Sequence, residues 1–541
     1  MSIFIDRYDN PHHVRNRQLR SSLTWLFWFL AVMGVGGLLS LVMVVRGPNV
    51  SVIAWLIYLT GVAIIFYRPR YGLYLVIFLV LVGDNYLTPW FPFTKNFSSG
   101  ESLLYLNDAL IVSPLESYFA LIFISWLGRG AMQRKMSFYF SELFLPAMVF
   151  LAFIFFGLFY GVSTGGNLNI ALWESRPLFY LVAMLVLTNN LIETRQQASN
   201  LLWAALLALF VEGVIGSYTF LIVLKGSLQG VEAITEHAAA IHMNTLFVLA
   251  AASWLYKSSW TKRLVLPLMI LPVSLTYLAT QRRAAFLTLG IALLLMAILL
   301  FRENRKAFWL IVPPIAVVGL LYIAVFWNAS GALGLPAQAV KSVVAEDQAD
   351  AADLSSNLYR QIENVNTGFT VHQRPLTGVG FGQKFYVIVP MPDISFFEWW
   401  QYFPHNSIIW IWLKMGVGGF ITMLFFVGSA IMIGARAIWR MPGDDLSAIA
   451  VTAVFYIIMH FIYAYADISW DTQSMVYVGM MMGLLSSLEH IASKPVEAKP
   501  NRWPWQPTPE AAPSLRPFPS NMMQQSRKGV IDDQKVGRTY P

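Results

Sequence analysis

Long apolar runs, separated by short polar segments, fill most of the chain between residues 23 and 489. A helix needs about 20 apolar residues to cross the hydrocarbon core of a bilayer. Backbone polar groups in lipid must be satisfied within their own segment, so these runs predict helices. The pattern predicts an all-α polytopic membrane protein with about 12–14 transmembrane helices. We place them at residues 23–45, 50–67, 71–83, 106–127, 142–161, 177–189, 200–224, 236–256, 263–280, 284–301, 308–327, 406–434, 446–465 and 473–489.

The two ends and one long internal segment lack this pattern. Residues 1–22 are polar and basic, and the apolar run after them is longer than a signal-peptide core of about 7–15 residues, which predicts a retained anchor. Residues 328–405 have an acidic, Ala-rich piece and an aromatic-rich end, and a loop of this length is often a functional lid or binding element. Residues 490–541 are rich in Pro, Gln, Ser and charge, which is typical of a disordered tail. The expected organisation is a cytoplasmic segment 1–22, a first helix group 23–327, a large outside loop 328–405, further helices 406–489 and a cytoplasmic tail 490–541.

Composition narrows the class. Hydrophobic residues make up 57% of the chain and charged residues 12%, whereas a soluble domain carries about 25% charged residues. This composition excludes a soluble enzyme. The net charge of +8 says little about nucleic acid in such a chain, because basic residues gather in the cytoplasmic loops of membrane proteins. The absence of cysteine excludes disulfides, thiolate catalysis and zinc–thiolate sites.

Lysine and arginine predict the orientation. The most basic loops fall on one side if the N-terminus is inside, and the C-terminus then returns to the same side. The arginines predicted outside run against this rule, and four of them are candidate ligands: Arg176, Arg282, Arg283 and Arg360. Guanidinium binds phosphate and carboxylate bidentately. Pairing with Glu174, Glu363 or lipid phosphates is the plain alternative to a functional role.

Other ionisable groups are predicted at the same outer level, and such groups beside or within spans are functional candidates. They are Asp108, His242, His405, His460, Asp467 and Asp471. Lys414 is predicted about 13 Å into its helix, at 1.5 Å per residue. It requires a buried acidic partner, a polar cavity or a broken helix, and Glu116 and Glu212 are possible partners.

Alternating glycines, Gly378, Gly380 and Gly382, lie near the end of the outside loop. A nucleotide-binding loop would need a strand–helix unit, which this region lacks. We therefore interpret the segment as flexible backbone that approaches a ligand.

In their order, several of these motifs resemble the O-antigen ligase and polymerase superfamily of bacterial surface polysaccharide enzymes. The motifs are Arg176 ahead of a span, Arg282-Arg283-Ala284 opening a span, the segment from Pro375 to Gly380, and His405-Asn406 followed by Gly416 and Gly419. The resemblance is strongest over residues 170–435. Lys414, Gln281 and the long tail depart from the pattern of that family.

The resemblance implies an activity on the periplasmic side of the bacterial inner membrane. A glycan carried on undecaprenyl pyrophosphate would be transferred to an acceptor hydroxyl, without metal or other cofactor. The implied catalytic residues are His405, Arg282 and Arg283, and the implied substrate-binding residues are Arg176, Arg360, Gly378, Gly380, Asn406 and Asp467. The expected partners are a lipid-linked oligosaccharide donor, a glycan or lipid acceptor, membrane lipids and other polysaccharide assembly proteins, with no nucleic acid.

The same chemistry follows from the residue types. Arginines in a site of low dielectric stabilise a departing pyrophosphate, and the neutral imidazole of His405 is a suitable base for the acceptor hydroxyl. The long tail and the aromatic-rich large periplasmic loop favour a polymerase over a ligase.

Two alternatives remain beside this interpretation. A glycosyltransferase that uses a lipid monophosphate would show acidic residues in the first outside loops, where only Asp84 and Glu101 occur, far apart. A polysaccharide transporter or flippase would show repeat symmetry and charges near the midplane. We find no internal repeat. A transporter remains an alternative because three charged residues are predicted within spans: Lys414, Glu116 and Glu212.

Overall fold

A computed structural model describes residues 50–82, 93–100, 102–134, 137–228, 231, 234–236, 238–329, 331, 333–345, 351–392 and 399–494. All regular structure in these residues is helical, which confirms the all-α prediction. The helices are α2 (Val50–Tyr67), α3 (Pro69–Val82), α4 (Pro114–Met132), α5 (Phe144–Ser163), α6 (Leu168–Leu191), α7 (Arg195–Tyr218), a π-helical turn η1 (Thr219–Val223), α8 (Ala239–Leu255), α9 (Trp260–Ala279), α10 (Arg283–Glu303), α11 (Arg305–Val325), α12 (Leu335–Val344), α13 (Ala351–Gln373), α14 (Ser407–Arg440), α15 (Asp445–Ala466) and α16 (Thr472–Ser493).

Nine helices of the described ranges are long and apolar enough to cross a membrane. Each predicted span within those ranges contains one helix, so the chain is a multi-pass membrane protein. Two predicted starts are wrong: α4 begins at Pro114 rather than at residue 106, and α6 begins at Leu168 rather than at residue 177. The predicted N-terminal segment 1–22, the anchor 23–45 and all but the first few residues of the predicted tail 490–541 lie outside the described residues.

The chain forms two compact units, residues 1–72 with 91–125 and residues 73–90 with 126–541. In the first unit, the end of α2 packs on the start of α4. The Tyr118 hydroxyl donates to the Tyr58 carbonyl at 2.7 Å and the Ser125 hydroxyl to the Ile65 carbonyl at 3.1 Å.

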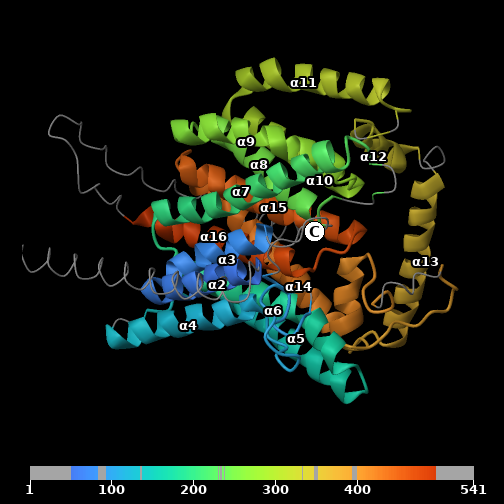
Figure 1. Ribbon diagram of the computed structural model, residues 1–541. Helices are drawn as coiled ribbons and strands as arrows, with labels where there is room; N and C mark the ends of the chain where they lie inside the picture. The colour runs from blue at the N-terminus through green and yellow to red at the C-terminus, as the bar shows by residue number, and fades with distance from the viewer. Residues whose placement is uncertain are drawn as a thin grey trace, which may run out of the picture. The chain divides into compact units, whose positions relative to one another are not determined.

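The second unit is a helix bundle in which α6 packs along α16, and α15 lies between α8 and α14 (Figure 1). Hydroxyls of Ser486 and Ser487 on α16 each donate to the Asn189 side chain of α6 at 2.8 Å. A Cβ added at Gly483 would lie 2.6 Å from the Cβ of Thr188. Small residues thus let these two helices approach closely, as is usual in membrane bundles.

Charged side chains at one end of the second unit pair with one another. This end gathers the starts of α7, α9 and α15 and the ends of α14 and α16. The ion pairs are Arg195–Asp444, Lys262–Asp445 at 3.3 Å, Arg436–Glu142 at 2.6 Å, Arg436–Glu489 at 2.9 Å and Arg440–Glu489 at 2.6 Å. The arginines and the lysine come from the loops that the charge pattern predicts to be cytoplasmic.

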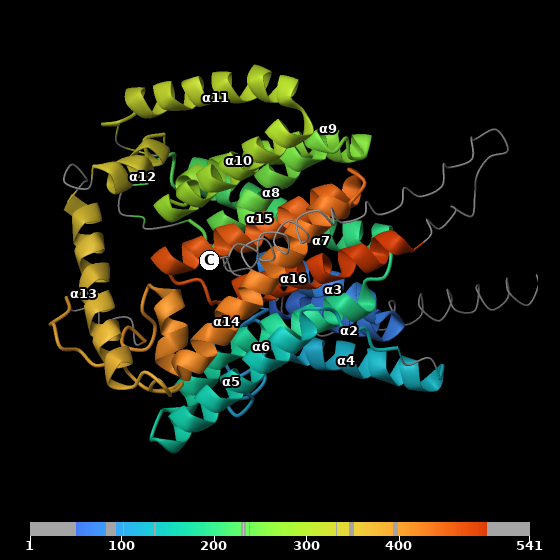
Figure 2. The ribbon, with the colours of Figure 1, turned by 180° about the vertical axis from the view of Figure 1, so that it is seen from behind.

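The loop 328–405 contains two helices of its own at the opposite end, α12 and α13. Figures 1 and 2 show α13 running across the bundle helices rather than along them. This helix buries polar side chains and exposes apolar ones. The buried polar residues are Glu363, Asn366, Thr367 and Thr370, and the exposed apolar residues are Leu354, Leu358, Val365 and Phe369. The polar face of the helix therefore lies inward, where Asn366 and Thr370 bond to the backbone of residues 386–389 and Glu363 bonds to His405.

Candidate functional site

Helix α14 is broken near its first third (Figure 2). Gly416 has φ 68° and ψ −176°, which separates a half-helix, residues 407–415, from the rest of α14. The segment Pro375–Gln383, which we call the glycine segment, fills the break. The Val379 amide donates to the Leu413 carbonyl at 2.7 Å and the Val417 amide to the Pro375 carbonyl at 2.9 Å. Irregular backbone is tolerated inside a membrane protein when its polar groups are satisfied in this way.

The glycines of this segment are needed for close packing. Gly378 and Gly380 have φ of 66° and 88°. A Cβ would lie 2.4 Å from the Leu413 carbonyl oxygen at Gly378 and 2.3 Å from the Gly161 Cα at Gly380. Their close approach is to the backbone of α14 and α5, so a packing role replaces the interpretation of a flexible loop. The predicted substrate contact of Gly378 and Gly380 stays a prediction.

The partner of Lys414 is Glu174, not Glu116 or Glu212. The Lys414 Nζ lies 2.8 Å from Glu174 Oε1, and both side chains are fully buried. Lys414 also donates to the Gln383 carbonyl at 2.6 Å, and Glu174 Oε2 accepts from the Gly382 amide at 2.5 Å. Two of the three conditions expected for a lysine at this depth, a buried acid and a broken helix, are therefore present.

His405 lies directly before α14 and is paired with Glu363 of α13. Glu363 Oε2 accepts from the His405 backbone amide at 2.7 Å and lies 3.0 Å from His405 Nδ1. Glu363 is 1% exposed and His405 is 28% exposed. A carboxylate only accepts, so Nδ1 carries the proton and Nε2 is left as a base, the arrangement in which a carboxylate orients a catalytic histidine. Asn406 caps α14 by accepting from the Ile409 amide at 3.1 Å.

Two more side chains of α13 lie beside this pair. The Tyr359 ring packs edge-on to the His405 imidazole, with ring centres 5.5 Å apart. Burial and the neighbouring Glu363 carboxylate raise the pKa of Tyr359 above its ordinary value, so its hydroxyl stays protonated. Arg360 follows, and its Nε is buried with no hydrogen-bond partner among the described residues. A buried, unsatisfied guanidinium nitrogen is costly and is suited to an anionic ligand.

The connection between α15 and α16 joins the site through Ser407. The Ser407 hydroxyl donates to the Asp467 carbonyl at 3.1 Å and accepts from the Ser469 amide at 3.1 Å. The Tyr463 hydroxyl donates to Asp467 Oδ2 at 3.2 Å. These hydrogen bonds bring Asp467 to the start of α14, directly after His405. Arg282 lies at the N-cap of α10, and α10 packs against α15.

Arg176 does not precede a span as expected. It lies in the third turn of α6, because the helix continues through Pro177. Trp173, one turn earlier on α6, stacks on Trp399 at 4.1 Å and packs edge-on to Phe403 at 4.9 Å. This part of α6 therefore lies beside the segment that leads to His405.

The structure thus brings His405, Asn406, Asp467 and Arg360 to one region. Arg282 and Arg283 lie at the start of α10, which packs against α15. Gly378 and Gly380 lie apart from it, at the break in α14.

The other outer ionisable residues go to different places. His242 and His460 are buried in the bundle, and His242 Nε2 lies 3.2 Å from the Ser474 hydroxyl, which donates to Asp471 at 2.7 Å. Asp108 belongs to the first unit, where it accepts from the Tyr105 hydroxyl at 2.8 Å.

Two residues of the site were not selected from the sequence as functional: Glu363 and Glu174. A signal for Glu363 exists, because Tyr359, Glu363, Asn366 and Thr370 recur at helical spacing within the loop. That spacing places polar side chains on one helix face.

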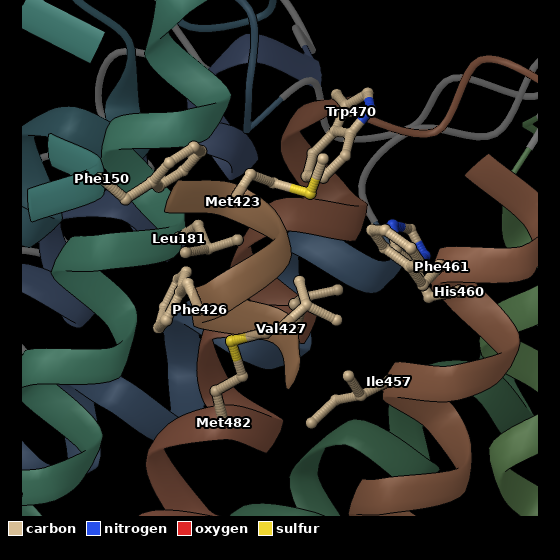
Figure 3. A pocket seen from close by; sticks show the side chains of 11 residues that line it. Phe150, Leu181, Met423, Phe426, Val427, Ile457, His460, Phe461, Trp470 and Met482 are labelled. Carbon is tan, nitrogen blue, oxygen red and sulfur yellow. The ribbon is translucent and has the colours of Figure 1, made fainter. Parts of the chain in front are cut away.

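An apolar pocket lies next to the site (Figure 3). Its lining comes from α5, α6, α14, α15, α16 and Trp470, and Figure 3 shows aromatic, aliphatic and methionine side chains around it with His460 at one side. The Trp470 indole donates to the Ser407 carbonyl at 2.7 Å, which links this pocket to the start of α14. No group of three or more His, Asp or Glu side chains in the described ranges has metal-site geometry, and the prediction of metal independence stays a prediction.

These features define a multi-pass, all-α membrane protein in which a buried Glu363 of the loop helix α13 pairs with a partly exposed His405. The family model described as O-Antigen ligase matches residues 267–424, a range that runs from α9 to α14 and includes Arg282, Arg283, Arg360, Glu363 and His405. This match confirms the resemblance to the O-antigen ligase and polymerase superfamily over residues 267–424. No curated protein matches the chain at a significant level.

Proposed function

We propose that the protein transfers a glycan from undecaprenyl pyrophosphate to an acceptor hydroxyl at the periplasmic face of the bacterial inner membrane. The product would belong to exopolysaccharide or O-antigen biosynthesis. The observation that carries the proposal is the His405–Glu363 pair, a partly exposed imidazole fixed through its Nδ1 by a buried carboxylate.

The reaction uses this pair as a base. The acceptor oxygen attacks the anomeric carbon of the donor sugar, and its proton passes to His405 Nε2. The bond between that carbon and the pyrophosphate oxygen breaks, and the lipid pyrophosphate leaves with the electron pair. Glu363 stabilises the imidazolium that forms, and a positioned base of this kind contributes about 10²–10⁴-fold to the rate.

Arginines stabilise the leaving group. Arg282 and Arg283 lie where α10 begins, and the buried Nε of Arg360 lies on α13, three residues before Glu363. Arg176 on α6 supplies a fourth cation near the segment before His405. Bidentate guanidinium contacts suit a pyrophosphate better than lysine does.

We favour a polymerase over a ligase. The loop segment before His405 stacks aromatic rings against α6 at Trp173, and aromatic rings are common sugar-contacting surfaces because they bury large areas while keeping a polar edge. Such a surface would grip a growing glycan chain.

A transporter or flippase is the second candidate, and one observation favours it. Broken helices and buried charges within the bundle are features of transporters, and α14 has both at Gly416 and Lys414. The two functions differ in their products, since only a transferase forms a glycosidic bond.

The test uses purified protein in nanodiscs with an undecaprenyl-pyrophosphate-linked repeat unit. Mass spectrometry should detect longer lipid-linked glycans together with free undecaprenyl pyrophosphate. Translocation without bond formation would support the flippase instead. In cells carrying His405→Ala, accumulated single repeats identify a polymerase, and accumulated long chains identify a ligase.

A further inference from the structure

We infer that Lys414 and Glu174 are positioning residues for this reaction: their buried ion pair fixes the half-helix 407–415 and thereby the place of His405. The inference rests on the proposed function and adds two residues to it. Neither side chain is exposed, so neither is assigned contact with the substrate.

The break in α14 is the reason that such a fixing element is needed. A continuous helix would hold its first turns in line with the rest of its length, but Gly416 interrupts α14 with a left-handed φ of 68°. The half-helix before the break must therefore take its orientation from side contacts. At its outer end those contacts are made by His405 with Glu363 and by Ser407 with the α15–α16 connection.

At its inner end the half-helix is held by Lys414. One ammonium group joins three elements, because it pairs with Glu174 of α6 and donates to Gln383 at the end of the glycine segment. Glu174 in turn accepts from the Gly382 amide. Lys414 is nine residues from His405, which is about 13 Å along a helix, so a small tilt at Lys414 becomes a displacement of the imidazole.

Glu174 also lies two residues before Arg176 on α6. The ion pair thus links the helix that carries a proposed pyrophosphate ligand to the helix that begins after the proposed base. A fixed distance between leaving-group contacts and base is what a transferase requires, and a misplacement of about 1 Å can cost on the order of 10²-fold in rate.

A contribution to folding stability alone does not explain why the Lys414–Glu174 ion pair is buried here. Replacing a buried ion pair by apolar residues of similar volume is often neutral or stabilising, whereas removing one partner leaves an uncompensated charge. Conformational specificity is therefore the better explanation here, because the ammonium and the carboxylate also bind two backbone groups of the glycine segment.

The test is the double variant Lys414→Met/Glu174→Met, which removes both charges at similar volume. We expect a folded protein with a lowered unfolding temperature, because the Gly382 amide and the Gln383 carbonyl lose their partners. We also expect kcat for glycan transfer to be lowered by about 10–100-fold and the donor KM to change by less than about threefold. Each single Met variant should fold poorly. The matched control is Lys262→Met/Asp445→Asn, an ion pair at the opposite end of the bundle, which should keep kcat and KM.

A stable double variant with wild-type kcat would overturn the positioning role. If the double variant does not fold, Glu174→Gln decides, because it keeps the shape and an acceptor for Gly382 but loses the charge. Lowered kcat at unchanged KM is then expected, and wild-type kcat overturns the inference. Absence of bond formation by the wild-type protein would instead contradict the proposed function, so the two failures are distinguishable.

Discussion

Replacing Glu363 by Gln perturbs the candidate site with little change in volume. In the native site one carboxylate oxygen accepts from the His405 amide at 2.7 Å and lies 3.0 Å from Nδ1. Gln can still accept one of these bonds, but it carries no charge. The half-helix after His405 should therefore stay folded, while the imidazolium formed during transfer loses its counter-ion.

The expected loss of kcat follows from the distance between the Glu363 carboxylate and the His405 imidazole. Two unit charges at this separation attract by about 5 kcal/mol at an effective dielectric constant of about 20. His405 is 28% exposed, so solvent screening reduces the loss to about 2–4 kcal/mol. At 1.36 kcal/mol per tenfold change in rate, kcat should fall by about 30- to 1,000-fold.

The assay is single-turnover transfer from a lipid-pyrophosphate-linked repeat by purified protein, read by mass spectrometry of lipid-linked products. Glu142→Gln is the control, because Glu142 is 60% exposed and pairs with Arg436 at the opposite end of the bundle. It should transfer at the wild-type rate. A Glu363→Gln protein that folds and transfers at the rate of the wild type would refute the base-orienting role of Glu363.

Three further results are expected. Replacing Arg282 and Arg283 together by Lys keeps the charge but loses the bidentate fork, so kcat/KM should fall by at least about tenfold; a wild-type value at normal expression would indicate a structural turn. Gly380→Ala should lower the unfolding temperature in detergent by an amount equivalent to about 2–5 kcal/mol, because the Cβ would meet Gly161 and the φ is positive; unchanged unfolding would contradict the packing role. Burial raises the pKa of Asp471 to about 6, above its unfolded value of about 3.9. The stability contributed by protonated Asp471 is complete below about pH 4 and is lost as the pH rises through about 6. Asp471→Asn should remove this pH dependence of the unfolding temperature, and an unchanged pH dependence would exclude Asp471 as its source.

The helical architecture was predictable because apolar runs in lipid have few alternatives to a helix. The predicted start of α14 was close to the observed one, because the apolar run begins at residue 406 and the helix begins at Ser407. The start of α6 was missed because Trp173-Glu174-Ser175-Arg176-Pro177 has the composition of a loop. In the fold Glu174 is neutralised by Lys414, and proline is tolerated within membrane helices when neighbours satisfy the freed backbone. Hydropathy cannot register that compensation.

The candidate site was partly predictable for a related reason. His405, Arg282 and Arg360 stood out because each is polar where the topology predicts an outer membrane boundary. Glu363 was considered only as a partner for arginine, since its pairing with His405 spans 42 residues of sequence and depends on how α13 folds over the bundle. The packing role of the glycine segment was missed because its positive φ values serve backbone contacts with α5 and α14, which are set by tertiary packing.

The central claim is that His405 is the base of a glycosyl transfer from a lipid pyrophosphate. The most direct measurement compares wild-type and His405→Gln proteins in nanodiscs across a range of pH, counting glycosidic bonds formed and lipid pyrophosphate released. The claim predicts one released pyrophosphate per bond for the wild type, an acid limb in its rate profile, and a rate lowered by about 10²–10⁴-fold in His405→Gln. Transfer by His405→Gln at the wild-type rate with the same acid limb would contradict it.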